Sequence, residues 1–165
     1  MTSRLDLDDY LPYLLNRGGA KIADAFGKVT RQHGISLQMW RVLAALNQQD
    51  GQSVGSLAAT TSIETSTLSR LLDQMQKKRL LLRQRDSDDQ RSVSIHRTQT
   101  AAAITEKLIP VALAYESKAL IGFARGEEKA LKSMLRRLYQ NLDSLGGSDR
   151  QAAAKKLQAK RRRTP

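Results

Sequence analysis

Residues 56–97 carry an order of patterns that few folds can accommodate. A short segment that Ser56 can cap is followed by a tight connection at residues 61–63 and then by a longer helical pattern. Residues 80–97 hold two apolar stretches, the second strictly alternating, on either side of a charged cluster, as the two strands of a β-hairpin do. Two short helices joined by a turn and followed directly by a hairpin predict a winged helix-turn-helix.

The second helix of this unit is predicted to have two chemically different faces. Its apolar face repeats at i, i+3, i+4 and i+7, and comprises Leu68, Leu71, Leu72 and Met75. Its polar face comprises Thr65, Ser66, Thr67, Ser69 and Arg70. Hydroxyl side chains near a helix start are more often caps than base readers. In this setting we interpret them as facing the DNA major groove, with free N–H groups at the helix start offered to phosphate.

Helical patterns flank this unit, at residues 8–34 and 99–146. The first contains Gly18-Gly19, which indicates either one helix with a tolerated kink or close contact, or a hinge between two helices. The second has Thr98 or Thr100 as its cap, contains Pro110, which predicts a kink, and ends at Gly146-Gly147. The predicted fold class is mainly α with a small β-hairpin wing, in which a DNA-binding lobe at residues 53–97 joins a helical dimerisation region.

A third helical pattern lies between the first flanking helix and the lobe. Ser36 can cap it, and the turn signal Asp50-Gly51 ends it. A short extended piece around Ser53-Val54 is expected to lead into the helix that Ser56 caps. Gly34 is placed to stop the preceding helix.

The charge balance indicates an acidic partner. The chain of 165 residues has 28 Lys and Arg against 16 Asp and Glu, a net charge of +12. Half of the excess lies in residues 148–165, where seven basic residues accompany one Asp. We expect residues 1–147 to form the domain and residues 148–165 to be a disordered basic tail, which is either a solvated appendage or a segment that contacts DNA phosphates.

Composition excludes several other functions. There is no cysteine and there are two histidines, so thiolate chemistry and ordinary zinc sites are not expected. No glycine-rich phosphate loop and no hydrolase or metalloprotease motif is present, so the chain is predicted not to be an enzyme and to need no cofactor or metal. No apolar run is long enough to span a bilayer, and the acidic start is unlike a signal peptide, which predicts a cytoplasmic protein.

Two stretches together resemble the MarR family of bacterial transcriptional regulators. They are LAATTSIETSTLSRLLDQMQKKRLLLRQRDSDDQR, with its Leu-Ala helix, its Ser-Thr-x-Ser-Arg recognition helix and its Asp-x-Arg wing, and the upstream SLQMWRVLAAL. The resemblance covers residues 8–146. It implies a homodimer that binds double-stranded DNA, in which the first and last helices intertwine and two winged lobes face successive major grooves.

The resemblance also implies residue roles. The groove-facing residues would be Thr65, Ser66, Thr67, Ser69 and Arg70, and in the wing Asp89 would orient Arg91 for the minor groove. The function implied is a sequence-specific regulator, a ligand-responsive repressor at a pseudo-palindromic operator. The alternative is an architectural DNA-binding protein with little sequence specificity, which the charge of +12 would serve.

The chain departs from the family pattern at the base of the wing. Arg79 stands where the family places glycine, so either a left-handed cap costs this residue ~1 kcal/mol or the helix ends elsewhere. Ala101 replaces another usual glycine, and His96-Arg97-Thr98 replaces an apolar residue before the threonine.

Relatives in the family also imply a ligand pocket beside the dimerisation helices. Here it would be lined by Tyr10, Tyr13, Arg17 and Trp40, and would take a small aromatic or acyl carboxylate, or its coenzyme A thioester, as effector. Trp40 as plain core and Arg17 paired with an acidic neighbour are the alternatives. Because cysteine is absent, a thiol switch is excluded, which leaves a non-covalent effector, a protein partner or constitutive binding.

Overall fold

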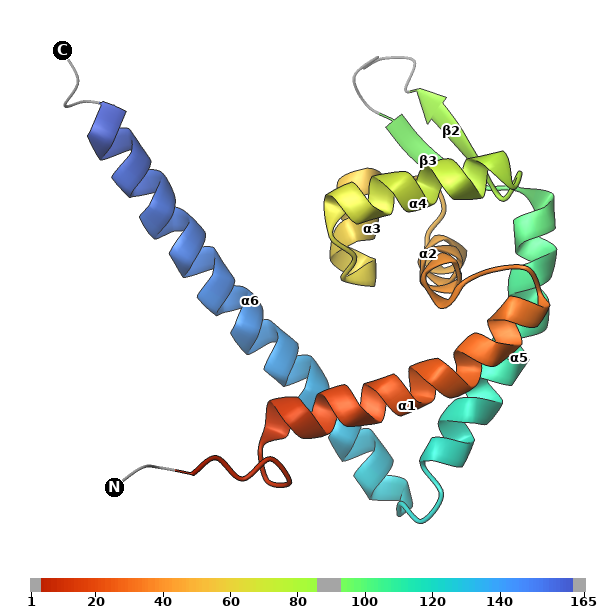
Figure 1. Cartoon of the computed structure of the whole chain (residues 1–165), viewed down its shortest axis with the longest axis horizontal. Coiled ribbons are helices and arrows are strands. Elements are labelled where there is room, and N and C mark those ends of the chain that lie inside the picture. The colour runs from red at the N-terminus through yellow and green to blue at the C-terminus, as the bar shows by residue number, and fades with distance from the viewer. Residues whose placement is uncertain (1–3, 86–92, 162–165) are drawn as a thin grey trace. The chain divides into compact units, whose positions relative to one another are not determined.

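The computed structural model describes residues 4–85 and 93–161, and side chains as far as residue 144. The chain divides into two compact units, Met1–Ala119 and Leu120–Pro165. Among the described residues the first unit holds five helices and a small sheet, and the second holds one helix (Figure 1). In this described part of the chain, no helix is both long and apolar enough to cross a membrane.

Helix α2 lies at the centre of the first unit (Figure 1). It spans Leu37–Gln48 and begins as predicted, because Ser36 Oγ accepts a hydrogen bond from the Met39 N–H at 3.2 Å. Its neighbours are α1 (Leu11–Gln32), α3 (Val54–Thr61), α4 (Thr65–Lys77) and α5 (Gln99–Ala119). Val42 and Leu46 on α2 are fully buried, so the core of this unit is built around this helix.

The sheet has three antiparallel strands in the order β1-β3-β2. The strands are β1 (Gln52–Ser53), β2 (Leu81–Arg85) and β3 (Val93–Arg97). Strands β2 and β3 pair from Leu81 opposite Arg97 to Arg85 opposite Val93, which confirms the predicted hairpin. The extended piece expected before α3 is β1, and it adds a third strand that the sequence did not predict.

The start of α3 differs from the sequence prediction. The helix begins at Val54, and Ser53 rather than Ser56 is its cap. Ser53 Oγ accepts from the Ser56 N–H at 3.1 Å, while the Ser56 hydroxyl donates to Gln52 Oε1 at 2.9 Å. Two serines three residues apart made either assignment possible, and the pairing of β1 with β3 decides it by ending the strand at Ser53.

Helix α1 is continuous through Gly18 and Gly19, so the hinge between two helices is wrong. A Cβ added at either glycine would meet nothing within 4 Å in the described chain. The helix ends where Gly34, with φ of +72°, was predicted to stop it. The glycine pair is therefore accommodated within one helix and makes no close contact with the residues that the structure describes.

Helix α6 (Arg125–Arg161) forms the second unit and is longer than the sequence predicted. It continues through Gly146 and Gly147, so residues 148–161 are helical where a disordered tail was expected. Each glycine costs a helix ~1 kcal/mol, but the Ala, Gln, Lys, Leu and Arg that follow are strong helix formers. Composition outweighs the glycine signal here.

Candidate nucleic-acid interface

Helix α4 separates an apolar stripe from a polar face. The stripe is buried as predicted, and its members are Leu68, Leu71, Leu72 and Met75. On the polar face the exposed members are Thr65, Ser66, Thr67 and Arg70. Ser69 is half-buried, and its hydroxyl donates to the Thr65 carbonyl oxygen at 2.9 Å. Four of the five residues predicted to face the groove are therefore accessible on one element.

The N-terminus of α4 is capped by a carboxylate that the sequence analysis missed. Glu64 accepts hydrogen bonds from the N–H groups of Ser66 and Thr67, each at 3.0 Å, and from the Ser66 hydroxyl. These bonds, led by that from the Ser66 hydroxyl, lower the pKa of Glu64 to about 2. Glu is not among the common N-caps, so the pattern gave no signal for it.

The Glu64 cap corrects one expectation about phosphate. Two of the N–H groups that were expected to be free for a DNA phosphate are already bonded to an anion. A phosphate would have to displace the Glu64 carboxylate to reach them. The N–H groups of Ser66 and Thr67 are therefore not free to bind a phosphate.

The C-terminus of α4 takes the first of the two alternatives for Arg79. Arg79 has a φ of 57°, in the left-handed region. Its N–H bonds to the Gln76 carbonyl oxygen at 2.9 Å and the Leu80 N–H bonds to that of Met75 at 2.9 Å, which is the Schellman pattern. The Thr98 hydroxyl donates to the Arg79 carbonyl oxygen at 2.8 Å, so the strained residue is held from the start of α5.

The wing is attached to α4 by an ion pair. Arg83 on β2 places Nη2 at 2.7 Å from Asp73 Oδ1 on α4. Arg85, further along β2, is exposed. The wing residues Asp89 and Arg91 lie outside the described residues. The base of the hairpin is thus fixed relative to α4, and β2 ends on the exposed cation Arg85.

The aromatic residues proposed for a ligand pocket fall into two groups. Trp40 is half-buried and packs edge-to-face on Phe26, with ring centroids 5.4 Å apart. It also lines a hollow of about 360 Å³ together with Arg41, Ala44, Ala45, Gln48, Thr60 and Thr61. The tryptophan is therefore part of the core edge and also borders a surface hollow.

The other three proposed pocket residues gather at the start of α1. Tyr10 precedes the helix, and the Arg17 guanidinium lies 5.4 Å from the centre of the Tyr13 ring. Arg17 also pairs with Asp8 at 3.3 Å, which is the acidic neighbour considered for it. Tyr13 lies about 20 Å along the helix axis from Phe26, at 1.5 Å per residue. Within one chain these three residues do not share the hollow with Trp40.

This fold and interface define a winged helix-turn-helix protein. The model of the MarR family matches residues 35–93. A MarR-family transcriptional regulator from Silicibacter pomeroyi has a solved structure that is 32% identical, with a TM-score of 0.75, over 84% of this chain and 96% of that chain. The organic hydroperoxide resistance transcriptional regulator of Bacillus subtilis is 22% identical over 141 residues, 86% of this chain and 92% of that protein.

A further solved structure has the same fold. BpsR of Bordetella bronchiseptica, whose DNA binding is regulated by 6-hydroxynicotinic acid, is 21% identical with a TM-score of 0.75, over 83% of this chain and 98% of that chain. The chain belongs to the MarR family of DNA-binding transcriptional regulators, as the sequence patterns indicated. Members of this family are regulators rather than enzymes.

Proposed function

We propose that the chain is a cytoplasmic homodimeric repressor that binds a pseudo-palindromic operator, with α4 of each protomer in the major groove. The observation that carries this proposal is the exposed polar face of α4, a helix whose apolar stripe is buried in the core of the same chain. Solved structures of MepR from S. aureus and of the transcriptional repressor CouR, which share the fold, are complexes with DNA. They support the same use of this lobe.

Arg70 and Ser66 are the proposed base readers. Arg70 is exposed one turn into α4, where a guanidinium can reach a guanine edge. The Ser66 hydroxyl gives its hydrogen to Glu64, so its oxygen meets DNA as an acceptor, suited to the amino group of cytosine or adenine. Thr65 and Thr67 flank these two residues, and Ser69, which is turned towards the helix backbone, supports close approach.

The wing is proposed to contact the neighbouring minor groove. Arg91 would enter the groove and Asp89 would orient it, because a narrow minor groove concentrates negative potential and attracts arginine. Support comes from the Arg83–Asp73 pair, which ties the base of the wing to α4. Major-groove and minor-groove contacts would then be made by one connected unit.

Dimerisation is proposed from the apolar residues that the terminal helices leave uncovered. On α1 the exposed ones are Leu11, Leu14, Leu15 and Ile22. In the second unit the exposed ones include Met134, Tyr139 and Leu142. Several large apolar side chains exposed on one helix are typical of a protein interface, and a second copy of the chain is the proposed cover.

An effector is proposed to bind the hollow beside Trp40. The indole offers an aromatic surface and Arg41, which also lines the hollow, offers a cation. This combination suits a small aromatic or acyl carboxylate, or its coenzyme A thioester. BpsR, which responds to an aromatic acid, supports the class of ligand. Tyr10, Tyr13 and Arg17 would join such a site only across a dimer.

Selection of DNA by the purified full-length chain tests the proposed function. Duplexes enriched from a random library should contain two related half-sites about 10 base pairs apart, the spacing of successive major grooves. Binding to the enriched duplex should survive an excess of random competitor. Enrichment of no sequence would instead favour the architectural alternative, in which the charge of +12 and the basic residues 148–165 bind DNA without sequence preference.

A further inference from the structure

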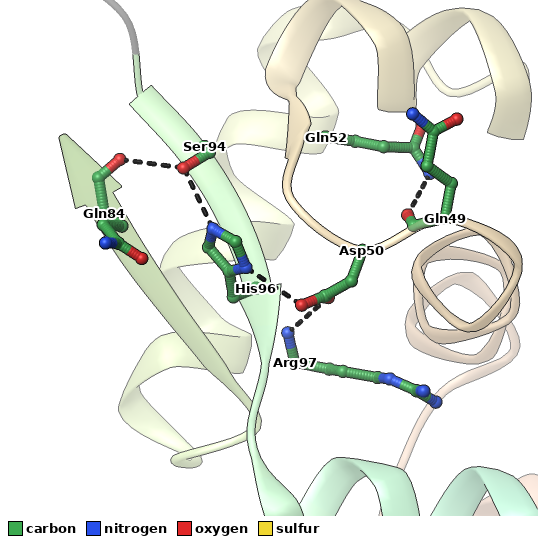
Figure 2. Close-up of polar contacts among 7 residues, drawn as sticks. All are labelled: Gln49, Asp50, Gln52, Gln84, Ser94, His96 and Arg97. Atoms are coloured by element: carbon green, nitrogen blue, oxygen red, sulfur yellow. Dashed lines mark hydrogen bonds and ion pairs between the residues drawn. The ribbon is translucent and has the colours of Figure 1, made fainter. Parts of the chain in front are cut away.

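Three side chains at the base of the wing form a continuous hydrogen-bond network (Figure 2). Asp50 lies in the turn after α2, and Ser94 and His96 lie on β3. His96 Nδ1 is 2.9 Å from Asp50 Oδ2, and His96 Nε2 is 3.0 Å from Ser94 Oγ. Ser94 Oγ is in turn 3.1 Å from the Gln84 carbonyl oxygen on β2. The network therefore links the α2 turn to both strands of the hairpin.

The hydrogens in this hydrogen-bond network can be counted. A serine hydroxyl has one hydrogen, and the Gln84 carbonyl oxygen can only accept, so Ser94 donates to Gln84. Ser94 Oγ must then accept from an N–H at His96 Nε2, while Asp50 accepts from an N–H at Nδ1. All three contacts are satisfied together only when both nitrogens of His96 carry a proton. A neutral ring leaves one contact without a hydrogen.

The same count of hydrogens distinguishes this network from a hydrolytic triad. In a triad the serine hydroxyl gives its hydrogen to the histidine, which acts as a base. The Ser94 hydroxyl is instead directed at the Gln84 carbonyl oxygen within the sheet. The arrangement suits a structural link that depends on a proton rather than a nucleophile.

Asp50, the acceptor at one end of the network, is held by hydrogen bonds from two residues of β3. Asp50 Oδ1 accepts from the Arg97 N–H at 3.0 Å, and Oδ2 faces His96. Partial burial raises the pKa of Asp50, but the hydrogen bonds from Arg97 and His96 outweigh it and leave the pKa below its usual value. Asp50 is therefore an anion throughout the pH range in which a histidine titrates.

The turn that carries Asp50 is itself anchored to α2. The Gln52 side chain is buried, and its amide donates to the carbonyl oxygen of Gln49 at 2.8 Å (Figure 2) and to that of Ala45 at 2.9 Å. Gly51, with φ of +72°, leaves room for the imidazole, since a Cβ there would lie 2.9 Å from His96 Cε1. The position of Asp50 is thus set by the core of the lobe, and His96 is seated on the turn.

The side chains that neighbour His96 on the adjacent strands are uncharged. Strand alternation places Leu82 and Gln84 of β2 on the same face as His96 and Ser94. On β1, Ser53 lies opposite Ser94. None of these side chains carries a charge. Among the described residues on these elements, the acidic group that faces His96 is Asp50.

The cations at neighbouring positions are directed elsewhere. The Arg97 guanidinium donates to Asn47 Oδ1. Arg83 lies at the alternate position of β2 and pairs with Asp73 at 2.7 Å. Arg85 lies on the same face of β2 as Arg83, opposite Val93 of β3. A proton at His96 therefore meets an anion on one side and a hydroxyl oxygen on the other.

We propose that His96 is a positioning residue for DNA binding, whose doubly protonated ring joins Asp50 to Ser94 and so holds the wing against the α2 turn. This inference rests on the proposed function, because it requires that the wing contact DNA. The link is complete when both ring nitrogens carry a proton, and loss of one proton releases one contact. DNA affinity should accordingly fall as the pH rises.

The test uses the full-length chain and the duplex enriched from the random library, with a scrambled duplex beside it. Affinities are measured by fluorescence anisotropy at constant ionic strength between about pH 5.5 and about pH 8, the range in which histidine titrates. The variants are His96→Gln, Ser94→Ala and Asp50→Asn. The matched control is His33→Gln, because His33 is the other histidine of the chain and is exposed at the end of α1.

The wild-type chain and His33→Gln should lose affinity for the enriched duplex by about three- to tenfold across this range, which corresponds to roughly one hydrogen bond. His96→Gln should show no such dependence, and in Ser94→Ala and Asp50→Asn it should shrink. A wild-type pH dependence that persists in His96→Gln would overturn the inference alone. A wild-type chain that never prefers the enriched over the scrambled duplex would overturn the proposed function.

Nitrogen NMR of the wild-type imidazoles gives an independent reading if His96→Gln fails to fold. At about pH 5.5 both ring nitrogens of His96 should carry protons that exchange more slowly than those of His33, because Asp50 and Ser94 hold them. A neutral His96 ring at this pH would overturn the inference.

Discussion

The winged lobe and the terminal helices bury their apolar residues to different extents. In the lobe Leu57 and Leu68 are 0% exposed and Leu72 is 1% exposed, whereas on α1 Leu11 is 52% and Ile22 is 49% exposed. The buried residues of the lobe belong to one core within the chain, to which α1 adds Phe26 and α5 adds Ala101 and Leu108. The difference indicates that one chain buries the apolar side of the lobe, while α1 leaves apolar side chains exposed that the proposed dimer would cover.

Shortening one buried leucine in the lobe should give the largest effect. Leu72→Ala should lower the free energy of unfolding by ~2–5 kcal/mol, because the side chain is fully packed and its loss leaves a cavity. Urea denaturation at fixed protein concentration measures it. Leu14→Ala, at a position 43% exposed within the chain, is the control. Equal losses that do not depend on protein concentration would erase the contrast between the two regions.

Removing Arg70 tests whether the lobe reads bases. Arg70→Ala should weaken binding to the enriched duplex by ~1–3 kcal/mol and binding to a scrambled duplex by less, because base contacts specify and phosphate contacts position. Lys77→Ala removes the same charge from the end of α4 and should weaken both duplexes equally. Anisotropy titrations give both values. An equal loss on both duplexes in Arg70→Ala would reassign this residue to the DNA backbone.

Two substitutions, one that introduces a glycine and one that removes a glycine, compare backbone conformation in the two regions. Arg79→Gly should raise the free energy of unfolding by up to ~1 kcal/mol by relieving the left-handed conformation at the end of α4. Gly18→Ala should raise it by ~1 kcal/mol if α1 is open at that position, as it is in one chain. Thermal unfolding measures both. A loss of stability in Gly18→Ala would show that a partner chain packs closely on this glycine.

The smallest expected effect is a change in acid unfolding when the Glu64 cap is removed. Because the folded pKa of Glu64 is lowered from 4.5 to about 2, the carboxylate stabilises α4 at pH values above 4.5, and this contribution is lost as the pH falls towards 2. Glu64→Gln should therefore flatten acid unfolding in this window, followed by circular dichroism. An unchanged acid profile would show that Glu64 does not hold the start of α4.

Much of the lobe could be predicted from the sequence because its signals are local. The spacing from Leu68 to Met75 predicted the buried stripe of α4, and the alternation from Val93 to Ile95 predicted the return strand. Both patterns report on neighbours in the chain and need no partner. At Arg79 the family pattern left two alternatives open, and the φ of 57° shows that the left-handed cap is the one adopted.

What could not be predicted depends on contacts between distant residues or on a competition of small terms. Asp50 and His96 are 46 residues apart, and their pairing follows from the sheet that also contains β1. The Glu64 cap required knowing that the carboxylate turns back onto the helix start. The end of α6 was misjudged because two glycine penalties were weighed without the helix formers that follow them.

The mass of the chain in solution tests the central contrast most directly. Sedimentation equilibrium at micromolar concentrations should give twice the chain mass of 18.4 kDa, and Leu14→Glu should shift the wild-type distribution towards a single chain because it places a charge in the proposed interface. The lobe of that variant should remain folded by near-ultraviolet circular dichroism. A mass of 18.4 kDa for the wild-type chain at every concentration, with full affinity for the enriched duplex, would contradict the account.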